Sequence, residues 1–327
     1  MSKKILISGG AGYIGSHNCL LLKQQGFEPI TYDNLSTGYK KFIQFGPFIH
    51  ADLLDKKLLE NTFMTHKPIA VMHFAAKAIV SESVTNPSLY YNNNLVGTIN
   101  LLDQMVKHGV KYLIFSSTCA TYGDPKFLPL TEDHPNSPLT SYGKSKLMIE
   151  KIFEDYEIAY GIKTVSLRYF NAAGADRNSL IGEDHNPETH LIPNVIDTVL
   201  GLRDELEIYG NDFDTKDKTA IRDYIHVEDL AIAHLKALEW LLDGNNSEIF
   251  NLGTGTGFSV LEIIKEVEKI SKTKVKVKFC KRRFGDPPIL VANHEKVKKH
   301  LNWTISNSNI ENIIKTAYNW HRKKVLN

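Results

Sequence analysis

Short apolar runs alternate with longer segments of helical periodicity over the first half of the chain. The runs predict strands at 4–8, 29–33, 48–51, 69–74, 112–117 and 163–168. The segments between them, in which apolar residues recur every three or four positions, predict helices at 17–25, 56–65, 95–107 and 145–159. Such alternation with apolar strands is typical of a parallel sheet covered by helices on both faces. Ligands of these sheets bind outside the carboxyl ends of the strands.

The pattern changes after residue 170. Residues 172–189 have the glycine, asparagine and proline content of a loop, and helices are expected at 193–202, 227–242, 260–270 and 310–324. This part of the chain predicts a smaller mixed α/β lobe over residues 171–327. Some of its segments could return to the main sheet, so the sequence does not define a sharp boundary between the lobes.

Composition narrows the range of partners. The 327 residues carry 39 basic and 37 acidic side chains, a balance too even to attract nucleic acid. No stretch approaches the roughly 20 apolar residues of a membrane-spanning helix. Cys19, Cys119 and Cys280 lie far apart, without metal-ligand spacing, as in proteins of a reducing compartment. We therefore expect a cytoplasmic protein with no membrane or nucleic-acid partner and no metal ion.

A glycine-rich turn follows the first predicted strand. Gly9, Gly12 and Gly15 have the spacing at which backbone N–H groups approach a pyrophosphate at a helix start. Asp33, at the end of the next strand, is placed to accept the 2′-hydroxyl of a ribose and would repel a 2′-phosphate. The pattern predicts NAD rather than NADP, bound to a Rossmann-type doubly wound parallel sheet over residues 1–170. A structural glycine turn without a ligand is the alternative.

Further along the predicted sheet edge, two more segments fit a dinucleotide. Asp52 ends the third strand, where it could bind the adenine amino group or cap the following helix. Phe74, Ala75 and Ala76 end the fourth strand, and the two small residues leave room for a cofactor.

Tyr142 and Lys146 are the candidate proton-transfer groups. Four residues apart, they share one face of a helix. A tyrosine with its usual pKa near 10 is a weak base at neutral pH, but a neighbouring ammonium and a positive nicotinamide favour the phenolate. Thr118 ends the strand about 25 residues earlier and could bridge the phenol and a substrate oxygen, or cap the following turn. A tyrosine and a lysine at this spacing also occur by chance.

These motifs resemble the extended short-chain dehydrogenase/reductase family, and within it the UDP-glucose 4-epimerases, over essentially the whole chain. The most specific stretches are 9–17, 33–38, 115–118, 141–146 and 167–171, followed by 182–185, 188–193 and 222–227. The resemblance implies a tightly held NAD and an epimerisation at carbon 4 of a UDP-hexose. Tyr142 would take the proton of the 4-hydroxyl while hydride leaves carbon 4, and the 4-keto sugar would turn over before hydride returns.

The resemblance also assigns contacts residue by residue. The implied NAD contacts are Gly9, Gly12, Tyr13, Ile14, Gly15, Asp33, Asn34, Leu35, Ser36, Thr37, Gly38, Asp52, Leu53, Phe74, Ala75, Ala76, Asn94, Ser116, Thr118, Tyr142, Lys146 and Phe170. The implied substrate contacts are Thr118, Tyr142, Asn171, His190, Leu191, Glu207, Tyr209, Arg222, Arg283, Asp286 and Leu290. Among these, Arg222 and Arg283 would hold the diphosphate and Asp286 a ribose.

The same resemblance suggests a homodimer formed through the helices at 95–107 and 142–159. Leu290 stands where relatives carry tyrosine if restricted to glucose and galactose, and a small residue if N-acetyl sugars are accepted. Leucine is intermediate, and we expect some tolerance of N-acetyl sugars. The chain departs from the family at Lys218, where glycine is common, and this puts the local turn in doubt.

Three other functions compete with this interpretation. A sugar-nucleotide 4,6-dehydratase usually has an acidic pair after the threonine, but Cys119 and Ala120 follow Thr118 here. A UDP-glucuronate decarboxylase matches the motifs of the smaller lobe less well. A non-catalytic NAD-binding regulator often lacks the tyrosine or the lysine, and both are present.

Overall fold

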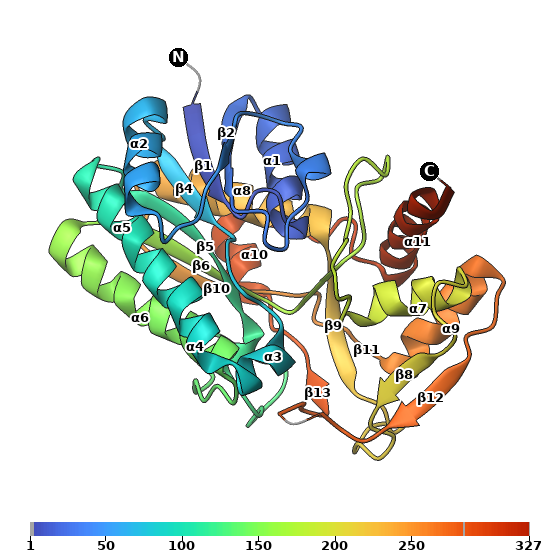
Figure 1. Ribbon diagram of the computed structural model, residues 1–327. Helices are drawn as coiled ribbons and strands as arrows, with labels where there is room; N and C mark the ends of the chain where they lie inside the picture. The colour runs from blue at the N-terminus through green and yellow to red at the C-terminus, as the bar shows by residue number, and fades with distance from the viewer. Residues whose placement is uncertain (1–2, 284, 327) are drawn as a thin grey trace.

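A seven-stranded parallel sheet forms the larger of two lobes in the computed structural model, which describes residues 3–283 and 285–326 (Figure 1). Its strands are, in spatial order, β10 (Glu248–Leu252), β6 (Lys163–Tyr169), β5 (Tyr112–Thr118), β4 (Ala70–His73), β1 (Lys3–Ser8), β2 (Phe27–Asp33) and β3 (Phe48–His50). The chain order reverses between β1 and β4, which opens a crevice at the carboxyl ends of the strands. The doubly wound fold is confirmed, and each predicted strand is correct to within two residues.

Alternate side chains of the strands bury against opposite helical layers. Ile5 and Ile7 of β1 belong to one cluster of buried residues with side chains of α1 (Tyr13–Gln24) and α8 (Val227–Leu242). Leu6 belongs to another, with side chains of α2 (Lys56–His66), α5 (Gly97–Lys107) and α6 (Ser141–Tyr160). Because both faces of the sheet are covered, its strands bury apolar side chains on both faces.

Three helix starts differ from the prediction, each for a local reason. Helix α1 begins at Tyr13 directly after the turn, with Gly12 as its extended N-cap. Helix α6 begins at Ser141 because the Thr140 hydroxyl accepts the N–H of Gly143. Helix α5 is preceded by α3 (Val80–Thr85), α4 (Pro87–Tyr90) and a π-helical segment, η2 (Tyr91–Val96). The predicted helix at 95–107 therefore includes the end of a wider π-helical turn.

The smaller lobe is built around β9 (Ile221–His226). This strand pairs with β7 (Asn171–Ala173), β11 (Gly257–Ser259) and β13 (Ile289–Leu290), and a separate ribbon joins β8 (Leu206–Tyr209) to β12 (Val277–Cys280). Helices α7 (Leu191–Val199), α9 (Val260–Ser271) and α11 (Ile310–Leu326) pack together and bury Ile196, Ile264 and Ile314. The region expected to be a loop thus contains the short strand β7.

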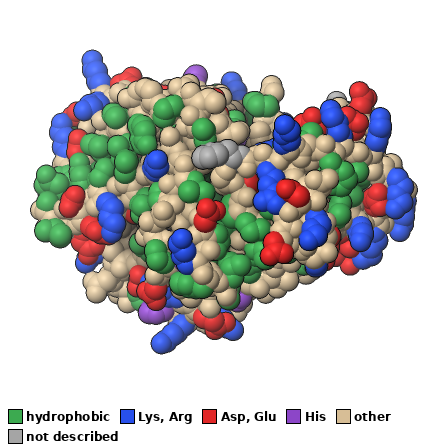
Figure 2. All heavy atoms as spheres, turned by 90° about the horizontal axis from the view of Figure 1, so that it is seen from below, with side chains coloured by type: hydrophobic (Ala, Val, Ile, Leu, Met, Phe, Trp, Pro, Cys, Tyr) green, Lys and Arg blue, Asp and Glu red, His purple; other side chains and the backbone are tan. Residues whose placement is uncertain are grey.

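Three elements of the second half lie with the larger lobe. Strand β10 pairs with β6, α8 covers one sheet face, and α10 (Glu295–Leu301) packs beside them. The chain therefore crosses between the lobes several times (Figure 1). Over the described residues, no helix is long and apolar enough to cross a membrane. Figure 2 shows positive and negative side chains interspersed on one face, in keeping with the near-zero net charge.

Candidate active site

The glycine turn after β1 is tightly packed. Gly9 has φ +78°, and a Cβ on it would lie 2.5 Å from the Ala75 nitrogen. A Cβ on Gly15 would lie 2.2 Å from the Gly9 carbonyl oxygen, so only glycine allows α1 to approach the turn this closely. Gly12 brings no side-chain cap to α1, which leaves N–H groups of its first turn for a ligand. This turn fits the pyrophosphate of NAD.

Asp33 is fixed beside that turn. Its two carboxylate oxygens accept the N–H groups of Ala11, at 3.0 Å, and Leu35, at 2.8 Å. Burial raises the pKa of Asp33, although these two hydrogen bonds oppose the rise. Each carboxylate oxygen keeps a further lone pair, so the side chain can still accept a ribose hydroxyl.

Asp52 pairs with Asn34 rather than capping a helix. The Asn34 amide donates to Asp52 Oδ2 at 2.6 Å, and Asp55, not Asp52, is the N-cap of α2. The two side chains line a hollow of about 500 Å³ together with Ser36 and Lys77. Of the two roles considered for Asp52, the cap of α2 is wrong, and the hollow has room for an adenosine.

The proposed proton-transfer groups meet where β5 ends and α6 begins. The Lys146 ammonium donates to the Ser116 carbonyl oxygen at 2.7 Å and lies 5.9 Å from the centre of the Tyr142 ring. Burial raises the pKa of Tyr142 to about 12, while a hydrogen bond with Thr118 lowers it. Burial also lowers the pKa of Lys146 to about 7, and the attraction of Glu150 opposes this change. The protein alone therefore favours the neutral phenol, and added positive charge is needed to ionise it.

Thr118 fills the capping role considered for it and is also placed for the catalytic role, which stays a prediction. Its Oγ1 accepts the N–H of Ala120 at 3.1 Å and so caps the short helix η3 (Cys119–Thr121). The same side chain hydrogen-bonds Tyr142. A hydroxyl can donate one hydrogen bond and accept two, so capping and proton positioning are compatible.

A buried ion pair behind Lys146 was missed in the sequence. Glu150 and Arg168 are both about 2% exposed in their side chains, and Glu150 Oε1 accepts from Arg168 Nε at 3.0 Å and from Ser117 Oγ at 2.6 Å. Glu150 lies one helical turn after Lys146. The sequence feature that could have indicated this pair is the position of Glu150 on the same side of the helix as Ile149 and Phe153, which are buried.

Asn94 joins the cofactor loop to α6. Its amide oxygen accepts the N–H of Lys77 at 2.8 Å, and its amide nitrogen donates to the Lys77 carbonyl at 3.0 Å and to Ser145 Oγ at 3.2 Å. The residue sits in η2, and π-helical turns of this kind are frequent at functional sites. Asn94 therefore positions the loop next to Tyr142 whether or not it also touches a cofactor.

On the substrate side, the predicted residues occur as polar pairs. Arg222 of β9 forms an ion pair with Asp286 and donates to the Ile221 carbonyl at 2.7 Å. The Arg283 guanidinium lies 3.8 Å from the centre of the Tyr209 ring, whose hydroxyl donates to Glu207 at 2.6 Å. These groups come from β8, β9 and the segment around β13, so they meet only in the folded lobe.

The remaining predicted substrate residues lie around these pairs. Asn171 donates to the Asp223 carbonyl at 2.9 Å, and His190 and Leu191 stand at the start of α7. Leu290 packs with Leu130 and Phe170. At the unusual Asp217-Lys218-Thr219 turn, Lys218 adopts φ +66°, the left-handed conformation that glycine takes more easily. Asp217 holds that turn by accepting the N–H and hydroxyl of Thr219.

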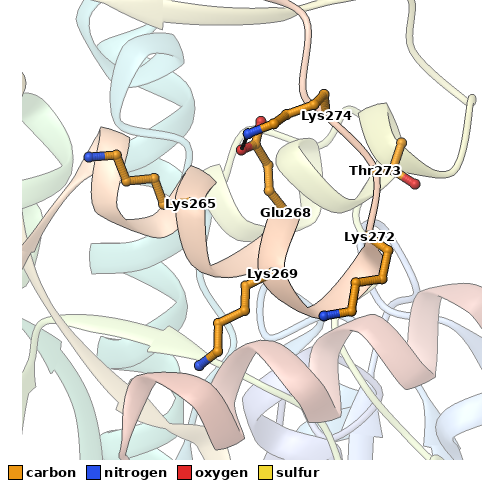
Figure 3. Close-up of a pocket in the computed structure, with 6 residues that line it drawn as sticks. All are labelled: Lys265, Glu268, Lys269, Lys272, Thr273 and Lys274. Carbon is orange, nitrogen blue, oxygen red and sulfur yellow. Dashed lines mark hydrogen bonds and ion pairs between the residues drawn. The ribbon is translucent and has the colours of Figure 1, made fainter.

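A second hollow lies apart from all of these residues. It is lined by Lys265, Glu268, Lys269, Lys272, Thr273 and Lys274 around the end of α9 (Figure 3). Within this set only Lys274 and Glu268 pair, at 2.6 Å. None of the predicted site residues belongs to it, so the chemistry is expected in the crevice between the lobes.

Comparison with known proteins places this geometry in a family. Residues 5–253 match the NAD dependent epimerase/dehydratase family. The UDP-glucose 4-epimerase of Rhizobium meliloti is 45% identical over 99% of this chain and 98% of its own. The UDP-glucose 4-epimerase of Brucella ovis, solved in complex with NAD, superposes with a TM-score of 0.95 at 45% identity, over 97% of this chain and 98% of that one.

A third relative has a wider specificity in its name. The UDP-Glc/GlcNAc 4-epimerase of Campylobacter jejuni superposes with a TM-score of 0.85 at 42% identity, over 98% of this chain and 100% of its own. The resemblance found in the sequence is therefore confirmed along the full length. The chain belongs to the NAD dependent epimerase/dehydratase family and, within it, to the UDP-glucose 4-epimerases.

Proposed function

We propose that this chain interconverts UDP-glucose and UDP-galactose by NAD-dependent epimerisation at carbon 4 through a transient 4-keto sugar. The observation that carries the proposal is the placement of Tyr142 and Lys146, with Thr118, at the carboxyl end of β5 beside the glycine turn. Bound NAD supplies the chemistry of taking hydride from carbon 4 and returning it. Full-length relatives that carry the epimerase name support the same reaction.

Tyr142 is the proposed base and acid. Its hydroxyl would take the proton of the sugar's 4-hydroxyl and later give it back, with Thr118 orienting both oxygens. Because burial alone raises the pKa of Tyr142 to about 12, proton removal depends on positive charge at the site. Protonated Lys146 supplies one such charge, and its hydrogen bond to the Ser116 carbonyl fixes where that charge lies.

The substrate lobe must hold one end of the substrate firmly and let the hexose turn. We propose that Arg222 and Arg283 bind the diphosphate, for which a guanidinium fork is suited. Asp286, now paired with Arg222, would exchange that partner for a ribose hydroxyl. Asn171, His190, Leu191, Glu207 and Tyr209 are proposed contacts of the uridine or phosphate, and the NAD contacts named from the resemblance remain proposals too.

Dehydration is less well supported than epimerisation. A 4,6-dehydratase needs an acid next to the threonine to eliminate water. Here Cys119 occupies the first position, and burial raises the pKa of its thiol to about 12. Ala120 at the second position carries no acid, so the site supports reversible hydride and proton transfer alone.

We further propose that the chain forms a homodimer through α5 and α6. Apolar side chains of α6 remain exposed in the single chain, including Met148 at 44% and Ile158 at 86%. Exposed apolar surface on this helix supports an interface there. Sedimentation of the untagged protein at several concentrations measures its oligomeric state.

Cys19, Cys119 and Cys280 are free, which supports the proposed cytoplasmic location.

The proposed activity has a direct test. The purified protein, given UDP-galactose but no added NAD, should form UDP-glucose, detected by a coupled glucose-product assay. Turnover without added NAD is expected because each cycle starts and ends with oxidised cofactor. Failure to form UDP-glucose, with NAD shown to be bound, would contradict the proposal.

A further inference from the structure

Two histidines and two glutamates converge in the segment between β7 and α7. Glu183, His185, Glu188 and His190, here called the His–Glu cluster, each offer one ligand atom, and these four atoms lie within 4.8 Å of one another. The segment rises between α1 and α11 (Figure 1). Trp320 of α11 donates to the Glu183 carbonyl at 2.8 Å, which holds the start of the cluster in place.

The distances within the His–Glu cluster are compatible with a small cation at its centre. Glu183 Oε1 lies 2.7 Å from His190 Nδ1 and 3.4 Å from His185 Nδ1, and the Glu188 oxygens lie 3.2 Å and 3.5 Å from the same two nitrogens. Four ligands around zinc, at about 2.0–2.2 Å each, would stand roughly 3.3 Å apart. The four contacts scatter around that separation.

An independent observation is the state of the most buried member. Glu183 is only 3% exposed, and its buried Oε1 atom has ion-pair contacts with His190 Nδ1 and His185 Nδ1 but no aligned hydrogen bond. His185 Nδ1 is in the same state. Glu188 differs, because its Oε1 accepts the N–H groups of Thr189 and His190 at 2.8 Å. A buried carboxylate oxygen and an imidazole nitrogen that lie close together without an aligned hydrogen bond fit the unliganded state of a metal site.

We propose that the His–Glu cluster binds one divalent transition-metal ion, with zinc as the best match to two imidazoles and two carboxylates. Nitrogen and oxygen ligands in a four-coordinate arrangement favour zinc over magnesium or calcium, which prefer six or more oxygens. This inference revises the expectation from the sequence that no metal is bound, and it reassigns His190 from a proposed uridine or phosphate contact to a metal ligand. The spacing of the four ligands is not diagnostic of a metal site, because they lie within eight residues of an irregular loop and have no helical spacing.

The ion would act as a structural link between the lobes. The His185 ring packs edge-on against Tyr13, with ring centres 6.3 Å apart, and Tyr13 opens α1 directly after the glycine turn. His190 directly precedes α7, where Leu191 begins the helix. A metal holding both histidines would therefore fix the start of α7 relative to the cofactor turn. Without a metal, the same residues would be two protonated histidines paired with two carboxylates.

Zinc titration of the NAD-loaded, untagged protein distinguishes these states. After treatment with a chelator and its removal, calorimetry should show one zinc ion bound per chain, and cobalt should give the intense visible absorption of a tetrahedral site. Magnesium at the same concentration should not bind. Thermal unfolding should move to higher temperature with zinc, a readout independent of epimerase activity.

Two variants locate the site. His185→Gln and Glu188→Gln should each weaken zinc binding by more than the roughly 10–100-fold typical of losing an outer-shell partner. His66→Gln, on α2 of the other lobe, is the matched control and should bind zinc as the unchanged protein does. Absence of zinc binding by the unchanged protein, or equal zinc binding by all three variants, would overturn the proposal and leave the cluster as ion pairs.

Discussion

Tyr142 and Lys146 lie four residues apart on one helix, whereas Arg222 and Asp286 on the substrate side are separated by 64 residues and meet through folding. The first pair is held by backbone groups and a buried ion pair behind it. The Arg222–Asp286 pair is held by one backbone hydrogen bond, from Arg222 to the Ile221 carbonyl, and the Asp286 side chain is 30% exposed. This difference fits the functions of the two pairs. Proton transfer needs a fixed geometry, and substrate binding needs groups that can exchange partners.

The largest expected effect comes from removing the phenol. Tyr142→Phe should lower turnover of UDP-galactose by roughly 10²–10⁴-fold, because no other group stands where the proton must be transferred. The variant should still bind NAD, and the absorption spectrum of the NAD released from the protein measures the bound amount. Tyr160→Phe, at the exposed end of the same helix, is the control and should keep full turnover. Unchanged turnover in Tyr142→Phe would refute the assignment.

The support behind the pair should matter mainly for stability. Glu150→Gln leaves the Arg168 guanidinium buried without its carboxylate, which typically costs about 3–5 kcal/mol of unfolding free energy. It also removes the attraction that raises the pKa of Lys146, so the activity–pH profile should shift. Glu154→Gln, in an exposed ion pair on the same helix, should change stability by less than about 1 kcal/mol in denaturant titration. Equal losses of unfolding free energy in both variants would show that the buried ion pair contributes no more to stability than the exposed one.

The sequence predicts the NAD and proton-transfer side of the site better than it predicts the substrate side. The period of apolar residues and the glycine spacing are local, and they predicted the strands from β1 to β6, the NAD turn and most of the helix after Tyr142. The Glu150–Arg168 pair spans 18 residues and the return of β10 to β6 spans more than 70, so neither leaves a local pattern. On the substrate side only the resemblance could nominate Arg222 and Asp286.

We expect burial of the Lys146 ammonium to lower the free energy of unfolding of the protein. Burial lowers the pKa of Lys146 from 10.5 to about 7, so between these values the unfolded chain binds a proton that the folded chain does not. Stability therefore rises with pH across that window and is lost as pH falls towards 7. Lys146→Met should abolish this rise and stabilise the NAD-free protein at pH 7, on the order of 2 kcal/mol, while turnover falls. Thermal unfolding from pH 7 to 10 measures both effects, and an unchanged pH dependence would contradict the buried charge.

Arg222→Lys tests the substrate side. Lysine keeps the charge but loses the planar fork, so KM for UDP-galactose should rise roughly tenfold, about 1.4 kcal/mol, with little change in kcat. The opposite split, a fall in kcat at constant KM, would place Arg222 in the chemical step. Arg282→Lys is a suitable control, because Arg282 pairs with Asp212 away from this contact.

The smallest effect concerns the space around the hexose. Leu290 is half-buried beside Leu130 and Phe170, and we propose that its intermediate size leaves room for an N-acetyl group. Leu290→Tyr should then lower turnover of UDP-GalNAc by about tenfold, within the 1–3 kcal/mol that steric discrimination in a pocket provides, and change UDP-galactose turnover by less than about twofold. Steady-state assays with both sugar pairs measure this selectivity. Since the diphosphate contacts are shared by both substrates, a loss that is equal for the two would point to a disturbed lobe rather than to hexose recognition. Absence of N-acetyl turnover in the unchanged protein would rule out the proposed tolerance.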